Sequence, residues 1–197
     1  MKRLLSLPGI VLLAVVVVGT VVWSAYNRLV GLDEGVTAAW SQVENVYQRR
    51  ADLIPNLVKT VKGARNFEQE TLQNVVEARA KVGQTTTGGE PTAEELGAFE
   101  ASQAELTAAL SRLLVVVERY PDLKATEAFR DLQRQLEGAE NRIAVERRRF
   151  NEVAQAYNTS RRRFPAVVIA GYFGFDEKAY FKSTEGANQP PVIDFSK

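Results

Sequence analysis

An uninterrupted apolar run near the start of the chain constrains the fold more than any other feature. From Leu4 to Tyr26 the sequence contains no charged residue, and residues 10–18 are entirely aliphatic. About 20 consecutive apolar residues suffice for a helix to cross the hydrocarbon core of a bilayer. We therefore predict that residues 1–26 form a single membrane anchor and that the remaining chain is a domain held at the membrane surface.

The residues flanking this run agree with an anchor and indicate its orientation. Trp23 and Tyr26 stand at its far end, where amphipathic rings favour the lipid–water interface. Lys2 and Arg3 precede the run and only Arg28 follows it closely, so the positive-inside rule places the bulk of the chain outside the cytoplasm. A cleaved signal peptide is the alternative, but its apolar stretch is typically only about 7–15 residues long. The prediction is a single-pass protein of the cell membrane.

Composition excludes several classes of chemistry. Cysteine and histidine are both absent, so the chain lacks a thiolate nucleophile, the commonest general base and the commonest metal ligand. Its 25 Lys and Arg residues nearly balance 24 Asp and Glu residues, which offers no basic face for nucleic acid. We predict no catalytic residue, no cofactor, no metal and no nucleic-acid partner.

Apolar residues after the anchor recur every three or four positions, the period of an amphipathic helix. The first seam comprises Leu29, Leu32, Val36, Ala39, Val43, Val46, Arg50, Leu53 and Leu57. A second seam runs from Phe129 to Phe164. The two helices span about 38 and about 41 residues, so each is about 60 Å long at 1.5 Å per residue. Their matched lengths predict antiparallel neighbours.

Two shorter helices are predicted between the long ones. One covers residues 67–82 and ends at Gly83. The other begins at Thr92, which forms a capping box with Glu95, and ends at Tyr120. These helices are too short to cover the whole length of the long pair.

The predicted fold is therefore all-α: an N-terminal transmembrane helix followed by an antiparallel up-down-up-down helical bundle with long first and fourth helices. The bundle occupies residues 27–165. Residues 166–197 contain many aromatic residues, glycines and prolines without a helical period, and they are predicted to form a non-helical tail.

Several blocks of the chain resemble the LemA family of bacterial membrane proteins. In order, they include Tyr26-Asn27-Arg28-Leu29-Val30, Ala39-Trp40-Ser41-Gln42-Val43-Glu44, Leu53-Ile54-Pro55-Asn56-Leu57, Tyr120-Pro121-Asp122-Leu123-Lys124 and Glu140-Asn141-Arg142-Ile143-Ala144. The resemblance runs from the anchor to about Phe181. It implies a membrane helix and an antiparallel helical domain but no biochemical activity. Family members are often encoded beside membrane metalloproteases, which implies a role in envelope upkeep.

The chain departs from the family pattern at four positions. Ala64 and Phe67 stand where the family often has Tyr and His, and Glu146 and Arg161 stand where it often has small or apolar residues. If these positions contact a partner, the partner surface of this protein differs.

Arg50 and Glu146 interrupt otherwise apolar seams, and a single polar seam residue often sets helix register. Helix length places Arg50 beside residues 139–140, so we predict an ion pair with Glu140 or Glu137. The alternative is that both long side chains reach solvent.

Three further features of the long helices are candidates. Pro55 removes a backbone donor and should kink the first helix near Ala51 and Asp52. Trp40 and Tyr47 stand seven residues apart and are expected to pack in the core, with an aromatic ligand slot as the alternative.

Arg161, Arg162 and Arg163 should reach the level of Asp33 and Glu34. There they could neutralise those carboxylates. They are expected either to contact anionic lipid headgroups or to form a solvated or paired face.

Together these features predict a membrane-tethered, non-enzymatic scaffold or adaptor that acts through membrane lipid and a membrane or envelope protein partner. The alternative is a self-assembling structural or membrane-shaping protein, for which a homo-oligomer is expected.

Overall fold

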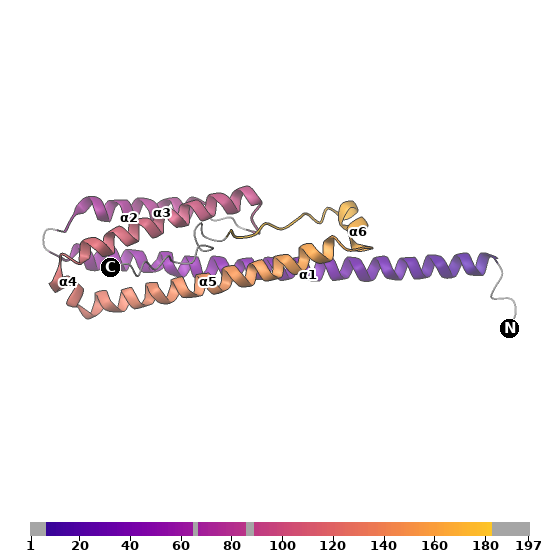
Figure 1. The fold of residues 1–197 in the computed structure, drawn as a ribbon, viewed down its shortest axis with the longest axis horizontal. Coiled ribbons are helices and arrows are strands. Elements are labelled where there is room, and N and C mark those ends of the chain that lie inside the picture. The colour runs from indigo at the N-terminus through magenta and orange to yellow at the C-terminus, as the bar shows by residue number, and fades with distance from the viewer. Residues whose placement is uncertain (1–6, 65–66, 86–88, 183–197) are drawn as a thin grey trace, which may run out of the picture.

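The computed structural model describes residues 7–64, 67–85 and 89–182, and this part of the chain is all-helical. Its six helices are α1 (Leu7–Lys62), α2 (Gln69–Thr85), α3 (Ala93–Val117), α4 (Pro121–Ala125), α5 (Glu127–Arg161) and α6 (Ala166–Phe173). They form an elongated rod from which the N-terminal part of α1 projects (Figure 1).

The anchor and the first bundle helix are one continuous helix of 56 residues, α1. Within the described residues α1 is the one helix that is long and apolar enough to span a membrane. None of its most apolar window is buried against the rest of the chain, so this window is available to lipid.

The principal packing partner of α1 is α5, which runs antiparallel to it. As residue numbers rise along α1 they fall along α5: the Trp40 ring contacts Phe150, and farther along Arg50 bonds Glu140. The fourth helix of the bundle, which is the second long one, was predicted to be continuous. In the structure its start is the separate short helix α4. Thr126 interrupts it, and the Thr126 side chain accepts a hydrogen bond from the Phe129 N–H at the start of α5.

The two shorter helices, α2 and α3, pack mainly on each other beside α1 and α5 (Figure 1). The capping box of Thr92 and Glu95 at the start of α3 is confirmed. The predicted end at Gly83 is wrong, because α2 continues to Thr85. A single glycine costs a helix only about 1 kcal/mol relative to alanine, and packing of the α2 apolar face outweighs that cost.

The predicted non-helical tail is wrong for its first part, because residues 166–173 form α6. This helix ends at Gly174, whose positive φ of 74° suits a residue without a side chain. The sequence of α6 is apolar almost throughout, so it shows no amphipathic period by which to recognise a helix. Residues 174–182 then run back along α5 as a non-helical segment, which we call the strap. Residues 183–197 of the predicted tail lie outside the described residues.

The core consists of three clusters along the rod. The base cluster, nearest the anchor, comprises Leu29, Ala166, Ile169 and Ala170. The proximal cluster comprises Val36, Ala39, Trp40, Val43, Tyr47, Leu96, Phe99, Ile143, Phe150, Ala154, Tyr157 and Phe181. The distal cluster contains residues of α1, α2, α3, α4 and α5, including Ile54, Leu57, Val75, Leu113, Leu123 and Phe129.

Candidate interaction site

Arg50 lies between the proximal and distal clusters and is only 3% exposed. Its Nη1 donates hydrogen bonds to Glu140 Oε2 at 2.8 Å and to Thr107 Oγ1 at 3.2 Å, and its Nη2 donates to Gln103 Oε1. Because Gln103 and Thr107 belong to α3 and Glu140 to α5, this one side chain joins three helices.

This polar layer selects one register of the helices. A buried guanidinium without partners costs several kcal/mol, so the helices are favoured in the alignment that gives Nη1 and Nη2 of Arg50 their partners. Glu140 is 54% exposed and retains part of its hydration, which lowers the cost of burying the pair. Glu146, the other polar seam residue, instead contacts Arg149 at 4.0 Å.

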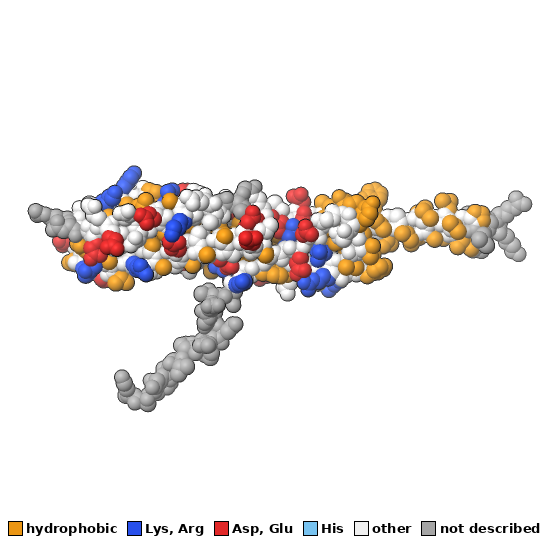
Figure 2. Space-filling model, turned by 90° about the horizontal axis from the view of Figure 1, so that it is seen from above, with side chains coloured by type: hydrophobic (Ala, Val, Ile, Leu, Met, Phe, Trp, Pro, Cys, Tyr) orange, Lys and Arg blue, Asp and Glu red, His pale blue; other side chains and the backbone are white. Residues whose placement is uncertain are grey.

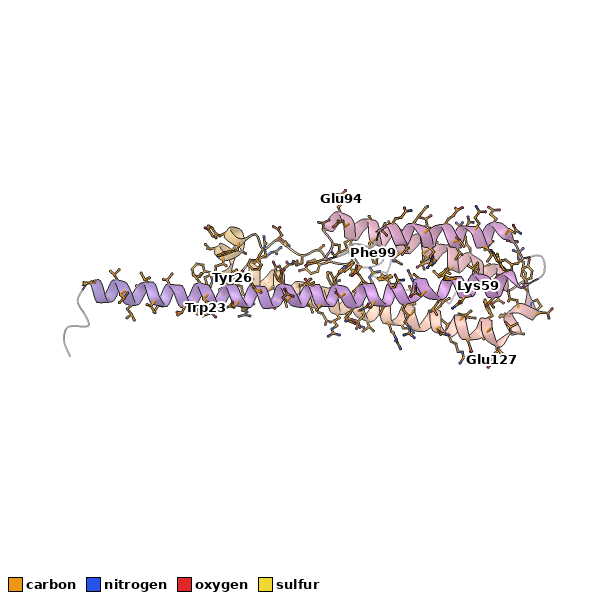
Figure 3. All side chains as sticks on the ribbon, turned by 180° about the vertical axis from the view of Figure 1, so that it is seen from behind. Trp23, Tyr26, Lys59, Glu94, Phe99 and Glu127 are labelled. Atoms are coloured by element: carbon orange, nitrogen blue, oxygen red, sulfur yellow. The ribbon has the colours of Figure 1, made fainter. Side chains whose placement is uncertain are left out.

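Pro55 leaves the Ala51 carbonyl oxygen without its usual helical donor, because proline has no N–H. The structure supplies a replacement from another helix: Arg79 Nε of α2 donates to Ala51 O at 3.0 Å. The α1 helix continues past Pro55 to Lys62, and Figure 3 shows it without the sharp bend that we predicted. Pro55 therefore creates an attachment point for α2.

Trp40 and Tyr47 pack in the proximal cluster. The Trp40 ring contacts the rings of Phe99, Phe150 and Phe181 at centroid distances of 5.5, 5.6 and 6.0 Å, and Tyr47 contacts Phe99 at 4.8 Å. Figure 3 shows Phe99 between α3 and α1, where these rings meet. Burial raises the pKa of Tyr47 above its ordinary value. The rings pack edge to face in the core as expected, and Tyr47 and Phe99 also line an open surface pocket between α1, α2 and α3.

Two asparagines of α5 hold the strap by its backbone. Asn158 Nδ2 donates to Lys178 O and Asn158 Oδ1 accepts from Lys178 N, both at 2.9 Å. Asn151 bonds Phe181 in the same way, at 3.0 and 2.9 Å. Seven helical residues span about 10.5 Å and three extended residues about 10 Å, so the two spacings match. The face of α5 thus recognises an extended peptide through its main chain.

Lys178 of the strap connects three other parts of the molecule. Its Nζ lies 2.7 Å from Asp33 Oδ1 on α1 and 2.7 Å from Glu90 Oε2 before α3, and 5.0 Å from the ring centre of Tyr157 on α5. Burial by itself would lower the pKa of Lys178, but hydrogen bonds and charges from Asp33 and Glu90 outweigh it and raise that pKa. The lysine is therefore held in its charged form.

The three consecutive arginines do not neutralise Asp33, which pairs with Lys178. Arg161 Nε donates to Phe175 O at 2.6 Å and Arg162 pairs with Glu177, so both hold the strap. Arg163 points elsewhere and lines a groove at the base of the bundle. Arg161 and Arg162 thus form a paired face, but their carboxylate partner is Glu177 and not Asp33 or Glu34.

An open groove follows α5 beside the strap. Its walls include Asn141, Ala144, Arg148, Glu152, Gln155 and Tyr180. Charged side chains of both signs lie over the bundle, whereas hydrophobic side chains gather around α6 and the projecting helix (Figure 2). Within the described ranges, acidic residues form no cluster with the geometry of a metal site.

Sequence reasoning missed the residues that hold the strap, Asn151, Asn158 and Lys178, and also missed Arg79. One signal was available: asparagine is a poor helix former, and Asn151 and Asn158 stand seven residues apart on the face of a long helix. Lys178 and Arg79 carry no comparable signal, because their partners are far away in the sequence.

The fold and these contacts define a membrane-associated all-helical protein, whose long N-terminal helix supports a bundle joined by internal polar contacts. Residues 39–195 match the model of the LemA family, and the chain belongs to this family. The resemblance seen in the sequence is therefore confirmed.

Similar proteins carry two kinds of name. Magnetosome protein MamQ 2 of Paramagnetospirillum magneticum is 28% identical over 186 aligned positions, which cover 85% of this chain and 68% of that protein. Magnetosome protein MamQ of Magnetospirillum gryphiswaldense is 29% identical over 203 positions, which cover 94% of this chain and 74% of that protein. Protein LemA of Metamycoplasma hominis is 22% identical over 159 positions, which cover 81% of this chain and 69% of that protein.

Proposed function

We propose that this protein is a non-enzymatic scaffold or adaptor, anchored by α1, whose up-down-up-down bundle acts through a protein partner in upkeep of the cell envelope. The bundle lies on the extracytoplasmic side, as the charges around the apolar run favour. The relatives named as magnetosome proteins have no reaction in their names, which agrees with this role.

The observation that carries the proposal is the way in which α5 binds the strap. Asn151 and Asn158 bond main-chain atoms, so this face accepts an extended segment by shape and backbone rather than by one particular side chain. The groove along the same face continues past the strap residues, with Arg148 and Gln155 among its walls.

A second observation supports a non-catalytic role. The buried polar side chains Arg50, Gln103 and Asn158 bond other parts of the same chain. Polar groups that serve catalysis converge on a cavity, whereas Arg50 and Gln103 join helices and Asn158 holds the strap. These three buried side chains thus have an architectural role.

Site-specific photo-crosslinking in membranes tests the proposal. A crosslinking residue at position 148 or 155 faces the groove, and one at Lys59 or Val115 is exposed on other parts of the bundle. We expect discrete adducts with a second protein from the groove positions and none from the controls. Adducts of the mass of a homodimer would favour the self-assembling structural protein instead. Absence of adducts at 148 and 155 would contradict both.

A further inference from the structure

A groove at the base of the bundle lies between α1 and the turn from α5 to α6. We call it the base groove; its walls include Val21, Ser24, Ala25, Arg28, Arg163 and Phe164. Residues 20–28 of α1 line it over about 12 Å, at 1.5 Å per residue. The groove thus extends from the apolar run of the anchor to the first charged residue after that run.

The polar end of the base groove is positively charged. Arg28 and Arg163 come from different helices and line the same groove. Among the described residues, neither arginine takes part in an ion pair, whereas their neighbours Arg161 and Arg162 both pair with Glu177. Two exposed guanidinium groups over one groove favour an anion, and the planar guanidinium suits a phosphate in particular.

The other end of the base groove is apolar and continues into a larger apolar surface. Phe164, Val168 and Tyr172 are 83%, 64% and 85% exposed. The helix α6, which carries Val168 and Tyr172, lies beside the end of the apolar run, because the Phe173 ring contacts the Tyr26 ring at 5.0 Å. Figure 3 shows Trp23 and Tyr26 at this level, and Figure 2 shows hydrophobic side chains surrounding it.

The position of this apolar surface along α1, beside the apolar run, indicates that lipid covers it. The adjoining residues of α1 are apolar, unburied and long enough as a run to cross a bilayer. A surface at the same height along the same helix meets the same lipid, with aromatic rings at the interface and arginines among the headgroups. An exposed aromatic such as Phe164 is costly in water but stabilising there.

We propose that the base groove binds one anionic phospholipid. The headgroup phosphate lies between Arg28 and Arg163, and an acyl chain lies along Val21, Ala25 and Phe164. Two positive charges favour a headgroup with net negative charge and disfavour one that carries a quaternary ammonium. The inference rests on the membrane tether of the proposed function but not on its protein partner.

Lipid titration of the full-length protein tests the site. The protein is purified in mild detergent, and bound phosphatidylglycerol is counted by native mass spectrometry. We expect the first phosphatidylglycerol to bind more tightly than any further phosphatidylglycerol molecule. We also expect it to bind more tightly than phosphatidylcholine. In the double variant R28Q/R163Q this affinity should fall about thirtyfold, the factor expected when two basic residues beside an anionic lipid are lost.

The matched control is R130Q/R142Q, which removes the same charge from exposed arginines far along α5. We expect this control to bind phosphatidylglycerol like the unaltered protein. A steric variant avoids changing charge: Ser24→Trp fills the groove and should weaken binding, whereas Asn27→Trp, which is exposed outside it, should not. Unchanged helical circular dichroism would show that each variant is folded.

Three results would overturn the inference. Equal lipid binding by R28Q/R163Q and R130Q/R142Q would mean that lipid contacts the apolar surface non-specifically and that the base groove is not a binding site. Equal affinity for inorganic phosphate would assign the arginines to a free anion. Recovery of the full chain in the soluble fraction would remove the tether and the site together. Absence of crosslinks from positions 148 and 155, which lie in the groove along α5, would instead contradict only the proposed protein partner. It would leave the lipid site unaffected.

Discussion

The proximal and distal halves of the bundle, on either side of Arg50, solve the same packing problem differently. The distal cluster draws on α1, α2, α3, α4 and α5 and is mostly aliphatic. The proximal cluster lacks α2 and contains the rings of Trp40, Tyr47, Phe99, Phe150, Tyr157 and Phe181. Where the shorter helices end, large rings and the strap occupy the space beside α1 and α5. The lesson is that a bundle with unequal helices needs a non-helical segment to close its core.

Removal of a large ring from the proximal half should have the largest effect. Trp40→Ala should lower the free energy of unfolding by about 3–5 kcal/mol and release the strap, because Trp40 contacts Phe181. Leu113→Ala in the distal half should cost about 2–5 kcal/mol and leave the strap in place. Thermal unfolding in detergent and limited proteolysis at Lys182 measure the two effects. Equal release of the strap by both variants would erase the distinction between the halves.

Loss of an asparagine tests whether the proximal half depends on backbone bonds to the strap. Asn158→Leu should cost about 1–3 kcal/mol, because the N–H and C=O of Lys178 lose their partner. The matched control is Asn141→Leu, an exposed asparagine of α5. Hydrogen exchange of the Lys178 amide reports the loss directly. Unchanged exchange would show that packing alone holds the strap.

The polar layer at the boundary is tested by a double-mutant cycle. Arg50→Leu and Glu140→Gln should show a coupling of about 1 kcal/mol, a modest value because Glu140 is half exposed. The same cycle with Glu137→Gln should give no coupling, since Glu137 accepts a hydrogen bond from Gln133 instead. Zero coupling to Glu140 would remove Arg50 as the residue that sets the register.

A second cycle examines the distal attachment of α2. Arg79→Met should cost about 1 kcal/mol in the unaltered protein, because the Ala51 carbonyl then lacks a donor. In a Pro55→Ala background the restored N–H can bond that carbonyl, so the same change should cost nearly nothing. Comparison of unfolding midpoints gives the difference. Equal costs in both backgrounds would show that Arg79 acts through other contacts.

The smallest expected effect is a pH dependence confined to the proximal half. The pKa of Lys178 is raised in the folded protein, so its contribution is complete below the ordinary value of 10.5 and is lost as pH rises through the raised value. Burial raises the pKa of Tyr157, which also favours unfolding in alkali. Proteolysis of the strap should therefore increase above about pH 10.5. Lys178→Met should weaken this dependence, and distal hydrogen exchange should show no comparable change.

Most of the helices were predictable because their signals are local. The spacing of Leu29, Val36, Val43 and Leu57 defines one face of α1, and Thr92 with Glu95 marks the start of α3. Helix lengths alone limited the partner of Arg50 to Glu140 or Glu137, and the structure pairs it with Glu140. The break at Thr126 was missed because no glycine or proline stands between Asp122 and Phe129 to mark it.

The strap and α6 were not predictable in the same way. Extended main chain that bonds side-chain amides has no period, and Phe181 enters a core cluster that contains residues of α3 but none of α2. The helix α6 is apolar on all sides since it faces both the bundle and the exposed base, so its pattern resembles neither a surface helix nor a strand.

The sequence by itself determined the apolar run that is long enough to span a membrane, the helical class and the family, because hydrophobicity and helical period are properties of neighbouring residues. Only the tertiary structure decided that Lys178 meets Asp33 and Glu90, that Arg79 bonds Ala51, and that Arg28 lies across a groove from Arg163. Each of these contacts joins separate segments. The packing of whole helices, which depends on side-chain volume throughout the core, brings those segments together.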